Sequence, residues 1–65
     1  MSPLDRQILV QLRAAGPAWK RSYQAAKVAV DRLITAKLIE PCAPEGLKAR
    51  NMIRITEAGR KALEQ

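Results

Sequence analysis

The 65-residue chain has no histidine, no phenylalanine and a single cysteine, Cys42. One cysteine cannot form an internal disulfide, and without histidine it gives neither a Cys/His nucleophile pair nor a plausible metal site. Asp31 and Glu57 are single carboxylates without a paired acid, so general acid–base catalysis is not indicated. With no phosphate-binding loop visible either, we expect no enzyme, no metal and no cofactor.

Long apolar runs are also missing from the sequence. No stretch approaches the about 18 consecutive apolar residues that a membrane-spanning helix needs. The first residues, Met1 to Asp5, have neither the basic start nor the apolar centre of a secretory signal. We therefore expect a cytoplasmic protein that does not enter a membrane.

Acidic residues are few: the chain has 6 Asp and Glu against 12 Lys and Arg, a net charge of +6. This excess indicates a polyanionic partner, of which nucleic acid is the commonest. An anionic membrane surface is the rival partner. It would require a helix with a basic face opposite exposed large apolar residues, whereas the first apolar helix needs its Leu and Ile face for the core.

The length allows one domain, spanning residues 1–65. Apolar residues recur every four positions from Leu4 to Leu12, which predicts a helix over Pro3–Ala15. Ser2 is expected to cap its start, and Gly16 to end it.

A second helix is predicted from Tyr23 to Ala36, because this stretch is rich in Ala and has neither Gly nor Pro. Ser22 is its expected N-cap. Trp19 is expected to anchor the preceding segment to the core, since one indole contributes a large share of the burial in so small a domain. The expected buried positions of the helix are Ala26, Val30, Leu33 and Ile34.

The second half predicts a β-hairpin of two strands, Leu38–Cys42 and Asn51–Ile55, followed by a last helix capped by Thr56. Pro41 has no N–H to donate, so its strand is expected at a sheet edge or interrupted. Gly59 in the last helix makes the helix about 1 kcal/mol less stable than Ala would. A close approach of the helix backbone to another element would explain a glycine there. The positions expected to face inward are Ala58, Ala62 and Leu63. The fold class is mainly α with a small β-hairpin (α+β).

The segments Val30–Leu33, Leu38–Glu40 and Ile55–Arg60 resemble the winged helix-turn-helix family, in particular its multiple-antibiotic-resistance-type (MarR-type) and PadR-type transcriptional regulators. The first two look like a recognition helix running into the wing, and the third like the strand-to-helix junction after it. The resemblance is good over roughly Ser22 to Leu63 and loose over Leu4 to Ala15. It implies three helices with a two-stranded wing, and a regulator that binds double-stranded DNA.

In this family the helix from Ser22 would lie in the major groove, and the hairpin tip would reach the neighbouring backbone or minor groove. The groove-facing candidates are Ser22, Tyr23, Gln24 and Lys27. The wing candidates are Lys48, Arg50 and Asn51. Lys20 and Arg21 are further candidates for phosphate contact, while Gln24 can pair with adenine. For Tyr23, a half-buried core position and a contact with DNA are equally open.

Two positions differ from the family pattern. Gly16–Ser22 leaves little room for the helix that the family usually has before the recognition helix, so that helix is cut to a turn or the layout differs. The family also often has glycine where Lys37 stands, and a left-handed non-glycine residue there costs about 1–2 kcal/mol.

The predicted reading helix also has an apolar outer face. The outward positions of the helix are Ala25, Val28 and Ala29. Such side chains can touch a thymine methyl group, but they can equally form a protein-binding face. The alternative function is therefore a winged-helix interaction module, of phage or mobile-element type, that docks on a host protein. Either a monomer or a homodimer is compatible with both functions.

Overall fold

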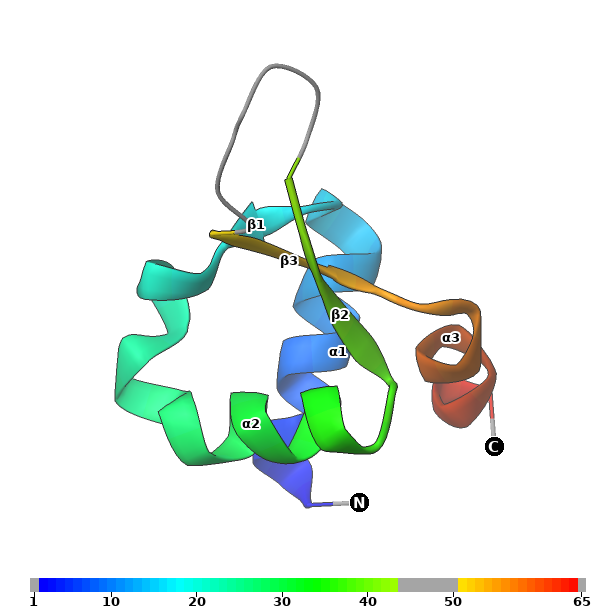
Figure 1. Ribbon diagram of the computed structural model, residues 1–65. Coiled ribbons are helices and arrows are strands. Elements are labelled where there is room, and N and C mark those ends of the chain that lie inside the picture. Colours follow the sequence, from blue (N-terminus) through cyan, green and yellow to red (C-terminus); the bar gives the residue numbers. More distant parts are fainter. Residues whose placement is uncertain (1, 44–50, 65) are drawn as a thin grey trace.

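The computed structural model describes residues 2–43 and 51–64, which form three α-helices, one 3-10 helix and a three-stranded antiparallel sheet (Figure 1). In chain order the elements are α1 (Pro3–Ala15), β1 (Ala18–Trp19), η1 (Lys20–Ala26), α2 (Lys27–Thr35), β2 (Ile39–Cys42), β3 (Met52–Ile55) and α3 (Glu57–Leu63). The mainly helical α+β class is confirmed. The expectation of only two strands is wrong, because β1 joins the sheet and gives the order β1-β3-β2.

Helix α1 has the predicted bounds and the predicted caps. The Ser2 hydroxyl accepts a hydrogen bond from the Asp5 N–H at 3.2 Å, and Gly16 follows the helix with a φ of 80°.

The buried Asp5 carboxylate accepts a hydrogen bond from Arg32 of α2 at 2.9 Å. This guanidinium holds the pKa of Asp5 below its ordinary value, against the opposite effect of burial. At pH values above the ordinary pKa of Asp5, the ion pair links α1 to α2 and stabilises the fold. This stability is lost as the pH falls through the lowered pKa, because the carboxylate is then protonated.

The single helix predicted from Tyr23 to Ala36, with Ser22 as its N-cap, is wrong in its first part. Lys20–Ala26 forms a 3-10 helix, interrupted by a non-helical backbone at Tyr23 (φ −110°, ψ 20°), and the α-helix begins only at Lys27. Ser22 is consequently not a helix cap. A helical element therefore precedes α2, and it is formed mostly by residues that the sequence placed in the long helix itself.

Contacts with other elements explain why this segment departs from its helix propensity. The Lys20 N–H donates to the Asn51 carbonyl at 2.9 Å, which holds the start of η1 against the sheet. The Tyr23 hydroxyl donates to Gln11 Oε1 of α1 at 3.1 Å, and its ring packs on the core. Tertiary contacts of this kind commonly override a modest preference for α-helix.

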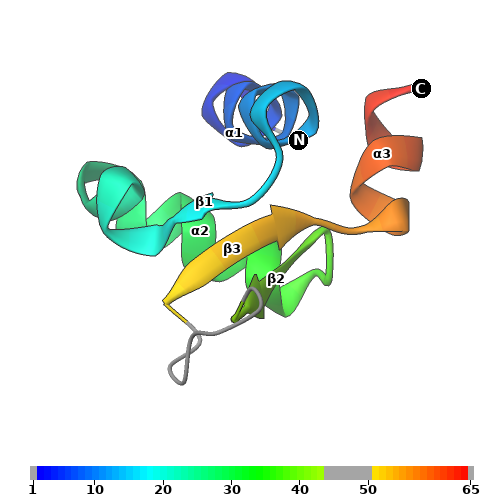
Figure 2. The same cartoon turned by 90° about the horizontal axis from the view of Figure 1, so that it is seen from above.

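The core lies between α1, α2 and the sheet, with α3 at the far end of β3 (Figure 2). Its buried members are Ile8, Leu9, Leu12, Ala29, Val30, Leu33, Ile39, Ile53, Ile55 and Leu63. Ile53 and Ile55 alternate with Arg54 along β3 and face this core. Arg54 lies on the opposite face of β3 and pairs with Glu40 of β2. Pro41 stands in β2, an edge strand, as its missing N–H requires.

Three predicted side-chain positions are wrong. Trp19 is 39% exposed instead of anchoring the core, because alternation along β1 turns Ala18 inward and the indole outward. Ala29 is buried instead of outward, since it lies one turn before the core residue Leu33. Ala58 is exposed, whereas Leu63 is buried as expected and Ala62 is half-buried.

Lys37 adopts the left-handed backbone conformation, with a φ of 63°. Its carbonyl accepts a hydrogen bond from the Thr56 hydroxyl at 2.7 Å, which fixes the turn between α2 and β2. We expect Lys37→Gly to raise the free energy of unfolding by up to about 1 kcal/mol, because glycine removes the left-handed cost but gains freedom in the unfolded chain.

Urea unfolding followed by circular dichroism measures this effect. The matched control is Ala36→Gly, because Ala36 has an ordinary φ of −77°. That variant should lose about 0.5–1 kcal/mol. A loss of stability in Lys37→Gly similar to that of the control would show that Lys37 is not strained.

Candidate functional site

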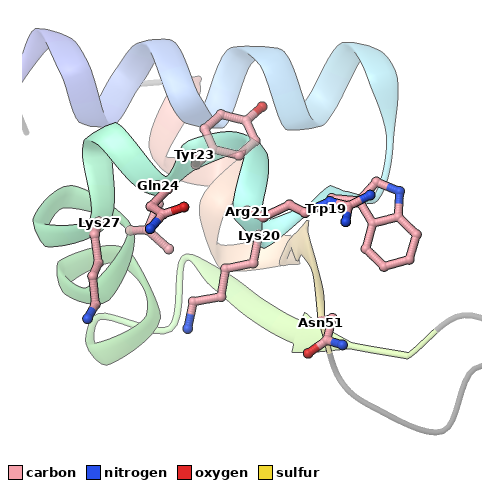
Figure 3. A pocket seen from close by; sticks show the side chains of 8 residues that line it. Trp19, Lys20, Arg21, Tyr23, Gln24, Lys27 and Asn51 are labelled. Atoms are coloured by element: carbon pink, nitrogen blue, oxygen red, sulfur yellow. The ribbon is translucent and has the colours of Figure 1, made fainter.

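An open hollow of about 380 Å³ lies where β1, η1, the start of α2 and the residue before β3 meet (Figure 3). It brings together six of the nine candidate residues from the sequence, which are Lys20, Arg21, Tyr23, Gln24, Lys27 and Asn51. Trp19 and the buried Val30 complete its wall. Residues from three successive elements, β1, η1 and α2, are thus gathered at one surface with Asn51.

The other three candidates do not line this hollow. Ser22 is exposed, but it is not among the lining residues. Lys48 and Arg50 lie outside the residues that the structure describes. The wing tip expected from the sequence therefore has no structural account, and Asn51 is the one wing candidate whose position is known.

Among the residues that the structure describes, the wall of the hollow carries three cations, Lys20, Arg21 and Lys27, and no carboxylate. All three side chains are exposed, and none forms an ion pair within residues 2–43 and 51–64. Like charges around one concave surface reinforce one another, so the local potential is positive and attracts anions.

Two other hollows are lined by charges of both signs, which sum to −1 in the first of them and +1 in the second. One contains Asp31 together with the Asp5–Arg32 ion pair. The second contains the ion pair of Glu40 with Arg54, next to further residues of both signs. Of these three hollows, the one lined by Lys20, Arg21 and Lys27 therefore has the largest positive charge.

Lys20 and Lys27 extend to the same side of the molecule (Figure 3). Lys20 is held at its backbone by the Asn51 carbonyl, and Lys27 is the first residue of α2. Gln24 is exposed and comes one turn before Lys27 in the chain. Its side-chain amide offers both a donor and an acceptor on the wall that carries the two lysines, which suits a ligand with anionic and hydrogen-bonding groups.

Tyr23 has a structural role in the wall. Its ring is half-buried against the core and its hydroxyl is bonded to Gln11, so it points toward α1 (Figure 3). Of the two roles that the sequence left open, these contacts support the core position. A contact of Tyr23 with DNA stays a prediction.

Trp19 belongs to the site although the sequence indicated a buried anchor. The Cζ atom of Arg21 lies 5.1 Å from the centroid of its ring, which is a cation–π contact. The signal that could have placed it here is the alternation of a two-residue strand, which is too short to recognise from sequence.

Within residues 2–43 and 51–64 no group of His, Cys, Asp and Glu is arranged to hold a metal ion. No helix in this part of the chain has the length and apolar character needed to cross a bilayer. Comparisons of the chain with protein-family models, with curated proteins and with solved structures found no match. The case for a function therefore comes from the chemistry of the hollow.

Proposed function

We propose that this protein binds double-stranded DNA at the hollow and acts as a small regulator of transcription. The observation that carries the proposal is the gathering of Lys20, Arg21 and Lys27 around one concave surface, to which residues 2–43 and 51–64 contribute no carboxylate. Lysine and arginine side chains neutralise DNA phosphates and release their counterions. The exposed amides of Gln24 and Asn51, on the same wall, can hydrogen-bond to base edges or to the backbone.

We further propose that the fold is a winged helix-turn-helix. The order of the elements supports this, because η1 stands where the family has a helix before the recognition helix, and the β2–β3 pair follows α2. In such an arrangement α2 enters the major groove, in place of the helix predicted from Ser22. Recognition helices touch bases with their N-terminal residues. Lys27 begins α2 at the hollow, which agrees with that geometry.

A salt series with a labelled duplex tests the DNA-binding function. Three phosphate contacts predict that the logarithm of the association constant falls with the logarithm of salt concentration with a slope of about −2.7. Contacts from residues outside the described ranges would make the slope steeper. Fluorescence anisotropy measures it, with duplexes of several sequences. Absence of binding at low salt, or an affinity that does not change with salt, would contradict the proposal.

The second candidate function is a protein-interaction module. It is favoured by Val28, which is 71% exposed on α2 although it is a large apolar residue. The face is smaller than the sequence indicated, because Ala29 is buried and only Ala25 remains beside it in the predicted set. A partner retained from nuclease-treated lysate and lost with Val28→Ser would favour this function, provided that the duplex titration fails.

A further inference from the structure

The guanidinium carbon of Arg21 lies over the Trp19 indole, 5.1 Å from the ring centroid, and both residues line the hollow. We propose that Trp19 and Arg21 form a preorganised site for one phosphodiester group of the bound duplex, with Arg21 as the phosphate ligand and Trp19 as its positioning residue. This inference rests on the proposed function. It assigns a specific role to a tryptophan that the sequence placed in the core.

The backbone on both sides of this pair is fixed. Trp19 pairs with Met52 in the β1–β3 ladder. The next N–H, that of Lys20, donates to the Asn51 carbonyl at 2.9 Å. Arg21 therefore starts from a backbone that is attached to the sheet, and the Trp19 ring restrains the far end of its side chain. Less side-chain entropy is left to lose when the guanidinium binds a ligand.

The contact with Trp19 leaves the hydrogen-bond donors of the guanidinium available. The Cζ atom of Arg21 lies over the indole, 5.1 Å from the ring centroid, and a cation–π contact uses no hydrogen-bond acceptor. The N–H donors of the guanidinium lie in the plane of the group and match two oxygens of a phosphate. Arg21 has no hydrogen bond or ion pair within residues 2–43 and 51–64 that would occupy these donors.

The position of the pair favours a phosphate over a base edge. Trp19 and Arg21 lie at one end of the hollow, and Lys27, at the start of α2, lies at the other (Figure 3). When α2 occupies a groove, the opposite end of the hollow meets the sugar–phosphate backbone that borders it. Removing a phosphate contact lowers the affinity for DNA equally for all sequences. Removing a base contact lowers it only for sequences that carry that base.

Four variants test the site by DNA titration over a salt series. Arg21→Ala should weaken binding about five- to tenfold at 0.1 M salt and reduce the slope by about 0.9, equally for duplexes of different sequence. Trp19→Leu should weaken binding about two- to fivefold with no change of slope, because the charge remains while the stacking is lost. Arg21→Lys should behave like Trp19→Leu, and the double variant Trp19→Leu/Arg21→Lys should be no weaker than either.

A control variant, Arg13→Ala, and an NMR measurement on the free protein show whether a loss of affinity comes from the Trp19–Arg21 pair. Arg13→Ala removes the same charge from a different hollow and should leave the affinity nearly unchanged. In the free protein, NMR should show the Arg21 side-chain protons shifted upfield by the indole, and Trp19→Leu should abolish this shift. Arg21→Lys keeps the indole, so it tests the pair even where Trp19→Leu fails to fold.

Each contrary result has a distinct meaning. Salt-dependent binding that is equally insensitive to Arg21→Ala and Arg13→Ala would overturn the phosphate site and leave the proposed function intact. A slope that falls with Arg21→Ala, together with full affinity in both Trp19→Leu and Arg21→Lys, would remove the role of Trp19. Absence of any duplex binding by the wild-type protein would remove both the proposed function and this site.

Discussion

Gly59→Ala is expected to lower the free energy of unfolding by about 3 kcal/mol, although alanine is ordinarily the better helix residue. A Cβ atom at this position would lie 2.2 Å from the Leu38 carbonyl oxygen and 2.8 Å from Cγ1 of Ile55. The Leu38 carbonyl cannot easily move, because it accepts the Thr56 N–H at 3.0 Å. A domain of this size has a total stability of roughly 3–10 kcal/mol, so a large share of it is at risk.

Urea unfolding monitored by circular dichroism measures the loss. The control is Ala58→Gly, because Ala58 is the exposed residue directly before Gly59 in the same helix. It should lose only the propensity difference of about 1 kcal/mol. Equal or greater stability of Gly59→Ala would mean that α3 does not approach the α2–β2 turn as closely as described.

The elements that could be predicted from the sequence are those whose signals are local. Ser2 and Gly16 set the ends of α1 through a side-chain cap and a positive φ, and both act within one helical turn. Thr56 caps α3 in the same way, by accepting the Gly59 N–H at 3.0 Å. Alternation of Ile53 and Ile55 around Arg54 gave β3 and its buried face.

The elements that could not be predicted depend on residues distant in the chain. β1 has only two residues and exists because Ala18 and Trp19 pair with β3, more than 30 positions later. The break at Tyr23 has no Gly or Pro to announce it, and follows from its contact with Gln11. A bond to a distant element leaves no periodic pattern in the sequence.

Most of the candidate site nevertheless came together despite the wrong helix. Its members between Lys20 and Lys27 are close in sequence, so a 3-10 segment keeps them near one another, as an α-helix would. What the sequence misplaced is the relation of these residues to α2. Lys27 is the first residue of that helix and not a position inside it, which moves the proposed groove contact toward its N-terminal end.

The double variant Lys20→Ala/Lys27→Ala is expected to bind duplex DNA roughly 50-fold more weakly than the wild-type protein at 0.1 M salt. Both lysines line the hollow, are exposed, and extend to the same side (Figure 3). Each phosphate contact contributes about 0.9 to the salt slope, so losing two should reduce its magnitude by about 1.8. Neither lysine side chain has a hydrogen bond or ion pair in the described part of the chain, so the fold should be unaffected.

The matched control is Arg60→Ala/Lys61→Ala on α3, because both double variants lower the net charge from +6 to +4. If the hollow binds the DNA backbone, the control should keep most of the affinity for DNA and nearly the whole salt slope. The reason is that exposed charges more than about 10 Å apart are largely screened at 0.1 M salt. Equal losses in the two double variants would mean that the overall charge of the chain attracts DNA without a defined site. A loss confined to the control would instead place the contact surface on α3 and contradict the assignment to the hollow.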